Sequence, residues 1–150
     1  MTDEICRSKR LLIDSGAVDR LAGEDKQSAA DIRRLKKEGY WPPVIPAAVL
    51  AECVSGDQHK DFRANRFIQT CHVLEKLSER DARRAGELRT KAQRGSVVDA
   101  ILVAIAEPGG VVLTDDLNDL EALATNAQDV TVVSTKPSRR NKKFSKSKRT

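Results

Sequence analysis

Four acidic side chains interrupt otherwise apolar stretches of this 150-residue sequence. Asp14 ends the run "RLLID", and Asp116 lies two residues after the run "VVLT". Glu52 and Asp99 are the only charged residues in "VIPAAVLAECV" and "SVVDAILVAIA". An ionised carboxylate beside an apolar core loses hydration free energy unless a charge or several hydrogen-bond donors replace its water. Each of these acids therefore serves a local structure or binds something.

If these acids lie close together in the fold, their charges indicate which ligand they would bind and which reaction they would support. Like charges at close range raise each other's pKa values, and a divalent cation removes that conflict. A site with carboxylate oxygens alone, without His or Cys, selects a hard metal such as Mg²⁺ or Mn²⁺. Such a cation polarises a phosphorus centre and lowers the pKa of an attacking water. The set therefore predicts phosphodiester hydrolysis.

Each acid also has a purely structural interpretation. Asp99 and Asp119 lie at the spacing of a helix-capping box, where carboxylates are favoured. Asp14 could orient its own turn, and Glu52 could reach the surface beside an apolar stripe. Taken singly, capping explains these residues well. It does not explain why the acids interrupt apolar sequence together and why two of them follow strands, so we favour a joint functional role.

The surrounding sequence predicts a parallel sheet covered by helices on both faces. Short β-branched stretches without polar alternation are typical of strands buried on both faces: they lie at 10–14, 43–46, 72–75, 111–114 and 130–134. Capping and spacing signals predict helices at 25–39, 46–54, 78–94, 96–107 and 116–127. Ligands of such sheets bind beyond the carboxyl ends of the strands. Asp14 and Asp116 are therefore expected at one edge.

Four stretches carry a resemblance to a known family. In their order and spacing, "LLIDSGAVDRL", "VIPAAVLAECV", "VVDAILVAIAE" and "VVLTDDLNDL" resemble the motifs of the PIN domain, most closely those of VapC-type toxin ribonucleases. The match spans residues 10–134. It implies a three-layer α/β/α fold with a central parallel sheet of about five strands, an acidic Mg²⁺ or Mn²⁺ site and endoribonuclease activity. It also implies a homodimer and inhibition by a cognate antitoxin.

The resemblance assigns roles by position. It implies four catalytic and metal-binding acids, one for each motif: Asp14, Glu52, Asp99 and Asp116. Ser15 and Thr114 fall where the family places hydroxyl groups beside these acids. In the last motif we rank Asp116 first as a metal ligand, Asp119 next as a supporting group or a ligand of a second metal, and Asp115 last. The segments before the first strand and after the last are longer than many relatives need.

Charge divides the chain into a body and a tail. The tail at 136–150 holds eight of the 27 basic residues and no acid, so the domain at 1–135 has 19 basic against 22 acidic residues, or −3. The tail lacks apolar residues to pack and is expected to be disordered. It could attract polyanions such as RNA through a salt-sensitive interaction, or it could be a solubilising extension.

A basic stripe on the predicted helix at 78–94 suggests a path for RNA. Arg94 leads directly towards Asp99, so Arg94, with Lys91, is a candidate contact for RNA phosphates. The alternative is an ordinary solvated face, because Glu87 lies within the stripe.

Composition sets the broad class. No apolar stretch approaches the roughly 18 residues of a membrane span, and the first residues lack an apolar leader, so we expect a cytoplasmic protein. Cys6, Cys53 and Cys71 have no metal-binding or redox spacing and are expected to be reduced thiols. His59 and His72 are not spaced as a metal pair.

Two further functions compete with a toxin nuclease. One is a nucleic-acid-binding protein without catalysis, acting through its tail, although 3% aromatic residues leave no evident platform for stacking bases. The other is a housekeeping PIN nuclease without an antitoxin. Aspartate-nucleophile phosphatases need a second Asp where this chain has Gly16, and no phosphate-binding Gly-rich loop is present.

Overall fold

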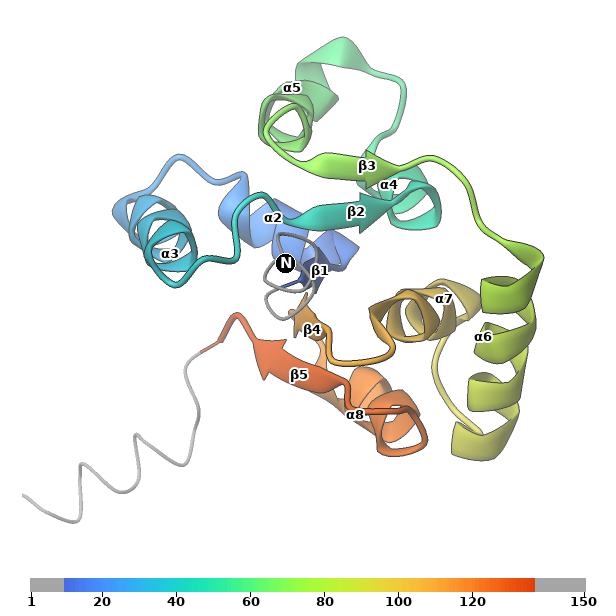
Figure 1. Ribbon diagram of the computed structural model, residues 1–150. Helices are drawn as coiled ribbons and strands as arrows, with labels where there is room; N and C mark the ends of the chain where they lie inside the picture. The colour runs from blue at the N-terminus through green and yellow to red at the C-terminus, as the bar shows by residue number, and fades with distance from the viewer. Residues whose placement is uncertain (1–9, 137–150) are drawn as a thin grey trace, which may run out of the picture.

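The computed structural model describes residues 10–136 and shows a five-stranded sheet with strand order β3-β2-β1-β4-β5 (Figure 1). All neighbouring strands are parallel. The strands are β1 (Leu11–Ile13), β2 (Val44–Pro46), β3 (His72–Leu74), β4 (Val111–Thr114) and β5 (Thr131–Ser134). The helices are α2 (Ser15–Leu21), α3 (Lys26–Lys37), α4 (Ala47–Cys53), α5 (Gln58–Ile68), α6 (Glu79–Ala92), α7 (Val97–Ala106) and α8 (Leu117–Thr125). The predicted α/β class and parallel sheet are confirmed.

Helices cover both faces of the sheet, as right-handed connections between parallel strands require. Helices α2, α3 and α5 lie on one side, whereas α6, α7 and α8 pack together on the other (Figure 1). The chain runs outward from β1 to β3 and then crosses back to β4. Strands β1 and β4 therefore lie side by side at the point where the strand order reverses, the usual place for a ligand in such sheets.

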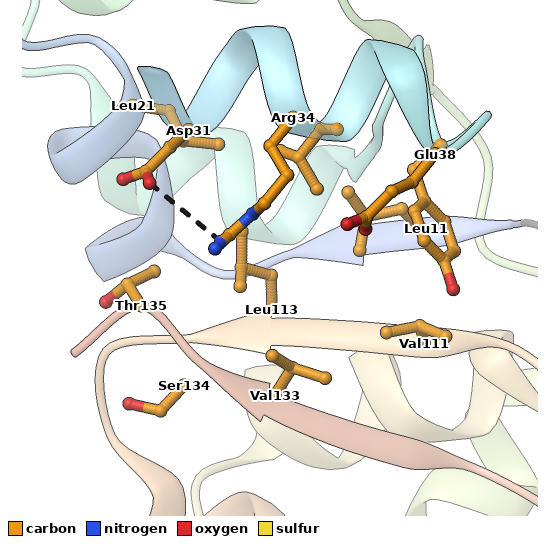
Figure 2. A pocket seen from close by; sticks show the side chains of 12 residues that line it. Leu11, Leu21, Asp31, Arg34, Glu38, Val111, Leu113, Val133, Ser134 and Thr135 are labelled. Atoms are coloured by element: carbon orange, nitrogen blue, oxygen red, sulfur yellow. Dashed lines mark ion pairs between the residues drawn. The ribbon is translucent and has the colours of Figure 1, made fainter. Parts of the chain in front are cut away.

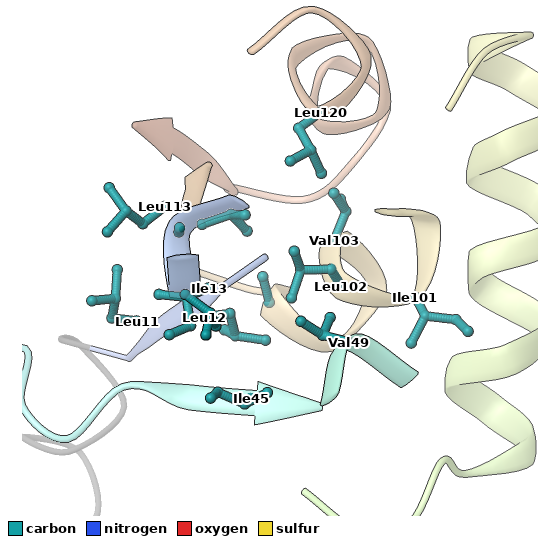
Figure 3. Packing of buried hydrophobic residues seen from close by; sticks show 14 of the residues in the cluster. Leu11, Leu12, Ile13, Ile45, Val49, Ile101, Leu102, Val103, Leu113 and Leu120 are labelled. Atoms are coloured by element: carbon teal, nitrogen blue, oxygen red, sulfur yellow. The ribbon is translucent and has the colours of Figure 1, made fainter. Parts of the chain in front are cut away.

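The core lies where the central strands meet α7. Leu12 and Ile13 of β1 are completely buried and pack with Ile45 of β2 and Leu102 of α7 (Figure 3). Helix α7 is almost entirely apolar, and Asp99 is its only charged residue. This apolar packing fixes the elements that carry the acids.

The prediction that every strand is buried on both faces was wrong for the sheet edges. The central strands β1 and β4 are buried, but β5 alternates between exposed and half-buried residues, and Val133 is 42% exposed. In β3, His72 is exposed. Both strands are at an edge, where the sheet has a neighbour on one side only.

Two helices were not predicted from the sequence. Helix α2 begins directly after Asp14, and α5 lies in the polar stretch after Asp57. The elements that were predicted are all present, with ends within two residues of those expected.

Within residues 10–136, no helix has both the length and the apolar character needed to cross a membrane. Cys53 and Cys71 are free thiols, as expected. Cys6 and the tail from residue 137 onwards lie outside the described residues.

Candidate active site

Asp14 lies at the carboxyl end of β1, and both of its carboxylate oxygens accept hydrogen bonds. It is the N-cap of α2, where its Oδ1 accepts a hydrogen bond of 2.8 Å from the Ala17 amide. Its Oδ2 accepts a hydrogen bond from the Thr114 hydroxyl of β4. The side chain caps a helix, as the structural interpretation proposed, and it also reaches across the sheet to the neighbouring strand.

Thr114 connects Asp14 to Asp116. Thr114 is completely buried, and its Oγ1 accepts a hydrogen bond of 2.8 Å from the Asp116 amide. The parallel register of β1 and β4 places this hydroxyl beside Asp14. The exposed Asp116 side chain caps α8 by accepting from the Asn118 amide at 3.3 Å. One hydroxyl group thus links the first and the last predicted acid.

Glu52 and Asp99 come from helices that contact each other, α4 and α7. Asp99 forms a full capping box with Ser96: the Asp99 amide donates to Ser96 Oγ at 3.0 Å, and Asp99 Oδ2 accepts from the Ser96 amide at 3.3 Å. Glu52 is in the last turn of α4 and is largely exposed. The prediction that Asp99 caps a helix is confirmed. A capping hydrogen bond does not neutralise a carboxylate, so Asp99 can also interact with other groups.

The charges of Asp14, Glu52 and Asp99 influence one another. Burial raises the pKa of Asp14 above its ordinary value, and the charge of Asp99 acts in the same direction. Hydrogen bonds from Thr114 and Ala17 offset only part of this rise. Partial burial also raises the pKa of Glu52, and the charges of Asp99 and Asp14 add to it. Carboxylates from three elements are therefore near enough for their charges to interact.

The acids of this edge differ in whether a basic residue neutralises them. Asp119 accepts a hydrogen bond from Arg94 Nε at 2.8 Å, and Asp115 Oδ1 lies 3.5 Å from Lys136 Nζ. By contrast, no basic side chain within residues 10–136 forms an ion pair with any member of a set that we call the unpaired acids: Asp14, Glu52, Asp99 and Asp116. These are the four acids that the sequence motifs single out.

The unpaired acids are not arranged as a closed metal site. Within the described part of the chain, no three Asp, Glu, His or Cys side chains lie close enough together to hold a metal ion. The chemistry and charge of the donors nevertheless fit a hard divalent cation, because the four side chains offer only carboxylate oxygens and form no ion pair with a basic residue of 10–136.

The start of α2 approaches the turn between β4 and α8 closely. Ser15, the half-buried first residue of α2, follows Asp14 directly. A Cβ atom at Gly16 would lie 2.5 Å from the Cβ of Asp115. Only a residue without a side chain allows this approach, so Gly16 helps to place Asp14 beside the β4–α8 turn.

The two candidate RNA-binding residues have different surroundings. Lys91 Nζ forms an ion pair of 2.9 Å with Glu87, which also pairs with Arg84, as expected of a solvated face. Arg94 forms an ion pair with Asp119 in the first turn of α8. It therefore lies next to the carboxyl ends of β1 and β4, which we call the acidic edge because Asp14, Asp115 and Asp116 follow them. A contact of either residue with RNA stays a prediction. The Arg94–Asp119 and Lys136–Asp115 pairs were not foreseen, because each joins segments distant in the sequence.

A cavity of about 360 Å³ lies between α3 and the strands β1, β4 and β5 (Figure 2). Its floor is apolar and includes Leu113 and Val133, and its rim carries Arg34 and Asp31, whose side chains lie 3.9 Å apart. None of the unpaired acids lines this cavity.

Comparison with known proteins yields a match in fold. No family model and no curated protein matches the sequence. Among solved structures, a toxin–antitoxin complex from Klebsiella pneumoniae has a TM-score of 0.57 at 20% identity, covering 73% of this chain and 88% of that chain. PAE2754 from Pyrobaculum aerophilum has a TM-score of 0.56 at 18% identity, and the match covers 80% of this chain and 90% of that chain. FitAcB from Neisseria gonorrhoeae has a TM-score of 0.55 at 14% identity, and the match covers 81% of this chain and 96% of that chain. At such identities the likeness establishes the fold, and this chain shares the α/β architecture of these three proteins.

Proposed function

We propose that this protein is a metal-dependent endoribonuclease that hydrolyses RNA phosphodiester bonds at the unpaired acids. One observation carries the proposal. Of the acids around the carboxyl ends of β1 and β4, Asp115 and Asp119 have basic partners, whereas the unpaired acids have none within residues 10–136. Carboxylates gathered without a counter-charge among the described residues are costly to a fold, and such arrangements concentrate at functional sites.

The residues of the site have separate tasks in this proposal. The unpaired acids would hold Mg²⁺ or Mn²⁺, which when bound polarises the scissile phosphate and lowers the pKa of the attacking water. Thr114 keeps Asp14 and the backbone of Asp116 in a fixed relation. Ser96 orients the first turn of α7, and with it Asp99. The Ser15 hydroxyl is available beside Asp14 for a substrate or a bound water.

We also propose that the nuclease is the toxin of a toxin–antitoxin pair. The sequence motifs resemble those of VapC-type toxins, and one structure with the same fold is described as a toxin–antitoxin complex. An antitoxin protein would then be the regulatory partner, and a homodimer the working form.

Cleavage of labelled RNA in Mn²⁺ or Mg²⁺ tests the enzymatic proposal. We expect cleavage with the cation and none in excess chelator. Asp99→Asn and Asp116→Asn should each lower the rate at least about tenfold, since loss of even a group that supports a metal ligand costs roughly ten- to a hundredfold in metal sites. Asp81→Asn, in the first turn of α6, is the control and should cleave normally. Cleavage by Asp99→Asn at the wild-type rate would contradict the proposal.

A growth assay tests the toxin proposal. Induced expression of the wild type in a bacterial host should arrest growth, and Asp99→Asn should relieve the arrest at equal protein levels. RNA cleavage in vitro without any effect on growth would instead favour the housekeeping nuclease.

A further inference from the structure

A groove lies between the last turns of α6 and the turn that leads to α7. Its volume of about 450 Å³ falls within the range of about 300–1,000 Å³ that is usual for small-ligand sites. We call it the basic groove, because two of the described residues that line it are arginines and none is acidic. Those residues are Gly86, Arg89, Thr90, Gln93, Arg94 and Gly95. Their chemistry suits an anion.

Two glycines shape the basic groove. Among the described residues, a Cβ atom at Gly86 would meet nothing within 4 Å, so the surface beside this turn of α6 is left open. Gly95 has a φ of +94°, and a Cβ atom there would lie 2.8 Å from Leu123 Cδ1. The turn is held by the Gln93 amide, which donates to the carbonyl oxygen of Arg89 at 2.9 Å. The local sequence therefore both opens the groove and fixes its end.

The two arginines supply hydrogen-bond donors to the groove. Arg89 Nε donates to the carbonyl oxygen of Gly95 at 3.3 Å, which holds its side chain across the turn. Arg94 Nε donates to Asp119 Oδ1 at 2.8 Å. Each guanidinium carries further N–H groups on its terminal nitrogens, in the fork that matches phosphate oxygens. The donors of the groove therefore suit a phosphate group.

The basic groove adjoins the acidic edge. Gly95 is followed by Ser96, whose amide donates to Asp99 Oδ2 at 3.3 Å, so Ser96 alone connects the groove to an unpaired acid. Arg94 makes a second connection, through Asp119 in the first turn of α8. A nucleic-acid strand carries one phosphate per nucleotide. A strand with one phosphate at the acids can therefore bring a neighbouring phosphate to the groove.

RNA needs positive charge at the acidic edge, because the unpaired acids repel phosphate groups and the domain at 1–135 has a net charge of −3. Arg94 and Lys136 contact the edge, but both form ion pairs with its acids. No acid within residues 10–136 forms an ion pair with Arg89. The charge of Arg89 is therefore available to attract a phosphate.

We propose that the basic groove binds a phosphate of the RNA backbone that neighbours the scissile one. Arg89 and Arg94 would hold this phosphate while the scissile phosphate lies at the unpaired acids. This inference rests on the proposed function in taking RNA as the ligand, but its binding test does not require catalysis. Inorganic phosphate shares the same chemistry, and the experiments separate the two ligands.

The first test measures the affinity for a fluorescein-labelled single-stranded RNA without metal, with every protein carrying Asp99→Asn. Arg89→Gln should raise the Kd about fivefold, the usual effect of losing one hydrogen bond. The slope of log affinity against log salt should fall in magnitude by about 0.7, the share of one phosphate contact. Arg80→Gln is the control: it removes the same charge about 180° round α6 from Arg89 and should leave both values unchanged.

A second pair of variants leaves both arginines in place. Gly86→Glu puts a carboxylate at the groove, three residues before Arg89 on the same face of α6. Gly86→Gln has nearly the same size and no charge. Position 86 has room for a side chain, so both proteins should fold. Gly86→Glu should raise the Kd at least as much as Arg89→Gln does, and Gly86→Gln should raise it clearly less.

The position and source of the bound phosphate are tested in the ¹H–¹⁵N spectrum of the Asp99→Asn protein. RNA should shift the signals of Arg89 Nε and the Gly95 amide, and Arg89→Gln should abolish the Gly95 shift. If inorganic phosphate shifts these signals and RNA does not, the groove binds a small anion only and the inference is overturned.

Two further results would overturn it: an unchanged Kd and salt slope in Arg89→Gln, or equal Kd values for Gly86→Glu and Gly86→Gln. In proteins without Asp99→Asn, Arg89→Gln should raise the KM for cleavage while kcat stays within about twofold. Failure of the proposed function has a different signature. RNA would then bind at the groove with the expected dependence on Arg89, but the wild type would not cleave it in Mn²⁺ or Mg²⁺.

Discussion

In the proposed site, Asp14 combines a structural and a chemical role in one carboxylate. Its two oxygens cap α2 and accept from Thr114, yet burial and the charge of Asp99 still raise its pKa. A raised pKa means that the folded state prefers the protonated form. The stability that Asp14 contributes is therefore present below its ordinary pKa of 3.8 and is lost as the pH rises through the higher native value.

Asp14→Asn tests this charge directly. Asn is as good an N-cap as Asp, so the helix start should survive. In metal-free buffer we expect the variant to exceed the wild type in free energy of unfolding by about 1 kcal/mol at pH 7, a usual scale for single substitutions. The difference should shrink as the pH falls towards 4. Urea denaturation between pH 4 and 8 measures it.

Asp119→Asn is the matched control, because Asp119 has Arg94 as a partner. It should show no gain at pH 7. If Asp14→Asn were less stable than the wild type at every pH, Asp14 would be a structural cap alone.

At the scale of elements, a comparison of two capped helices distinguishes the effect of a cap on stability from its effect on the proposed metal site. Ser96 caps α7 and Ser78 caps α6 with the same bond to the third residue of the helix, each 3.0 Å long. Ser96→Ala and Ser78→Ala should therefore each cost about 1 kcal/mol of stability. Only Ser96→Ala should also weaken Mn²⁺ binding, by about tenfold, because α7 carries an acid of the proposed site and α6 carries none. Thermal melting with and without Mn²⁺ measures both effects, and equal metal responses would contradict the assignment of Asp99.

The contact between α2 and the β4–α8 turn gives a second prediction at this scale. Gly16→Ala places a Cβ 2.5 Å from the Cβ of Asp115, so the turn must move. We expect a loss of about 1–3 kcal/mol, as for other overpacked sites, and a weaker response to metal. Gly86→Ala in α6 meets nothing within 4 Å and should stabilise the protein by about 0.5–1 kcal/mol. Denaturant titration of both variants measures these changes in the free energy of unfolding. No change for Gly16→Ala would show that the turn can move without cost and would contradict the prediction.

The elements missed from the sequence show where patterns are weak. Helix α5 is polar overall, and its inward side rests on Ala64, Phe67 and Ile68, a spacing of three and four residues that follows the N-cap Asp57. This apolar spacing indicates a helix, but it extends over too few residues to have been recognised in the sequence. Helix α2 is only seven residues long and merges with the strand motif that precedes it. The exposure of β3 and β5 depends on their place at the sheet edges, which strand composition does not encode.

At the scale of the whole molecule, tertiary contacts add information that the sequence lacks. Motif spacing singled out the four acids and ranked Asp116 first, Asp119 next and Asp115 last, and which of them contacts a metal stays a prediction. In the fold, Arg94 and Lys136 come from distant segments and form ion pairs with Asp119 and Asp115, and no such pair forms with Asp116 among the described residues. Such pairings follow from tertiary structure, so local sequence patterns cannot reveal them.

The central claim is that the unpaired acids form a cation site, and thermal melting in Mn²⁺ and Mg²⁺ tests it most directly. A cation that binds only the folded state stabilises it by roughly 2.7 kcal/mol at a hundred times its Kd. The account predicts a saturable rise in the Tm of the wild type and of Asp119→Asn. Asp99→Asn should melt higher than the wild type without metal, because a like charge is gone, and should gain little from metal. No saturable shift in the wild type, or an equal shift in Asp99→Asn, would contradict the claim.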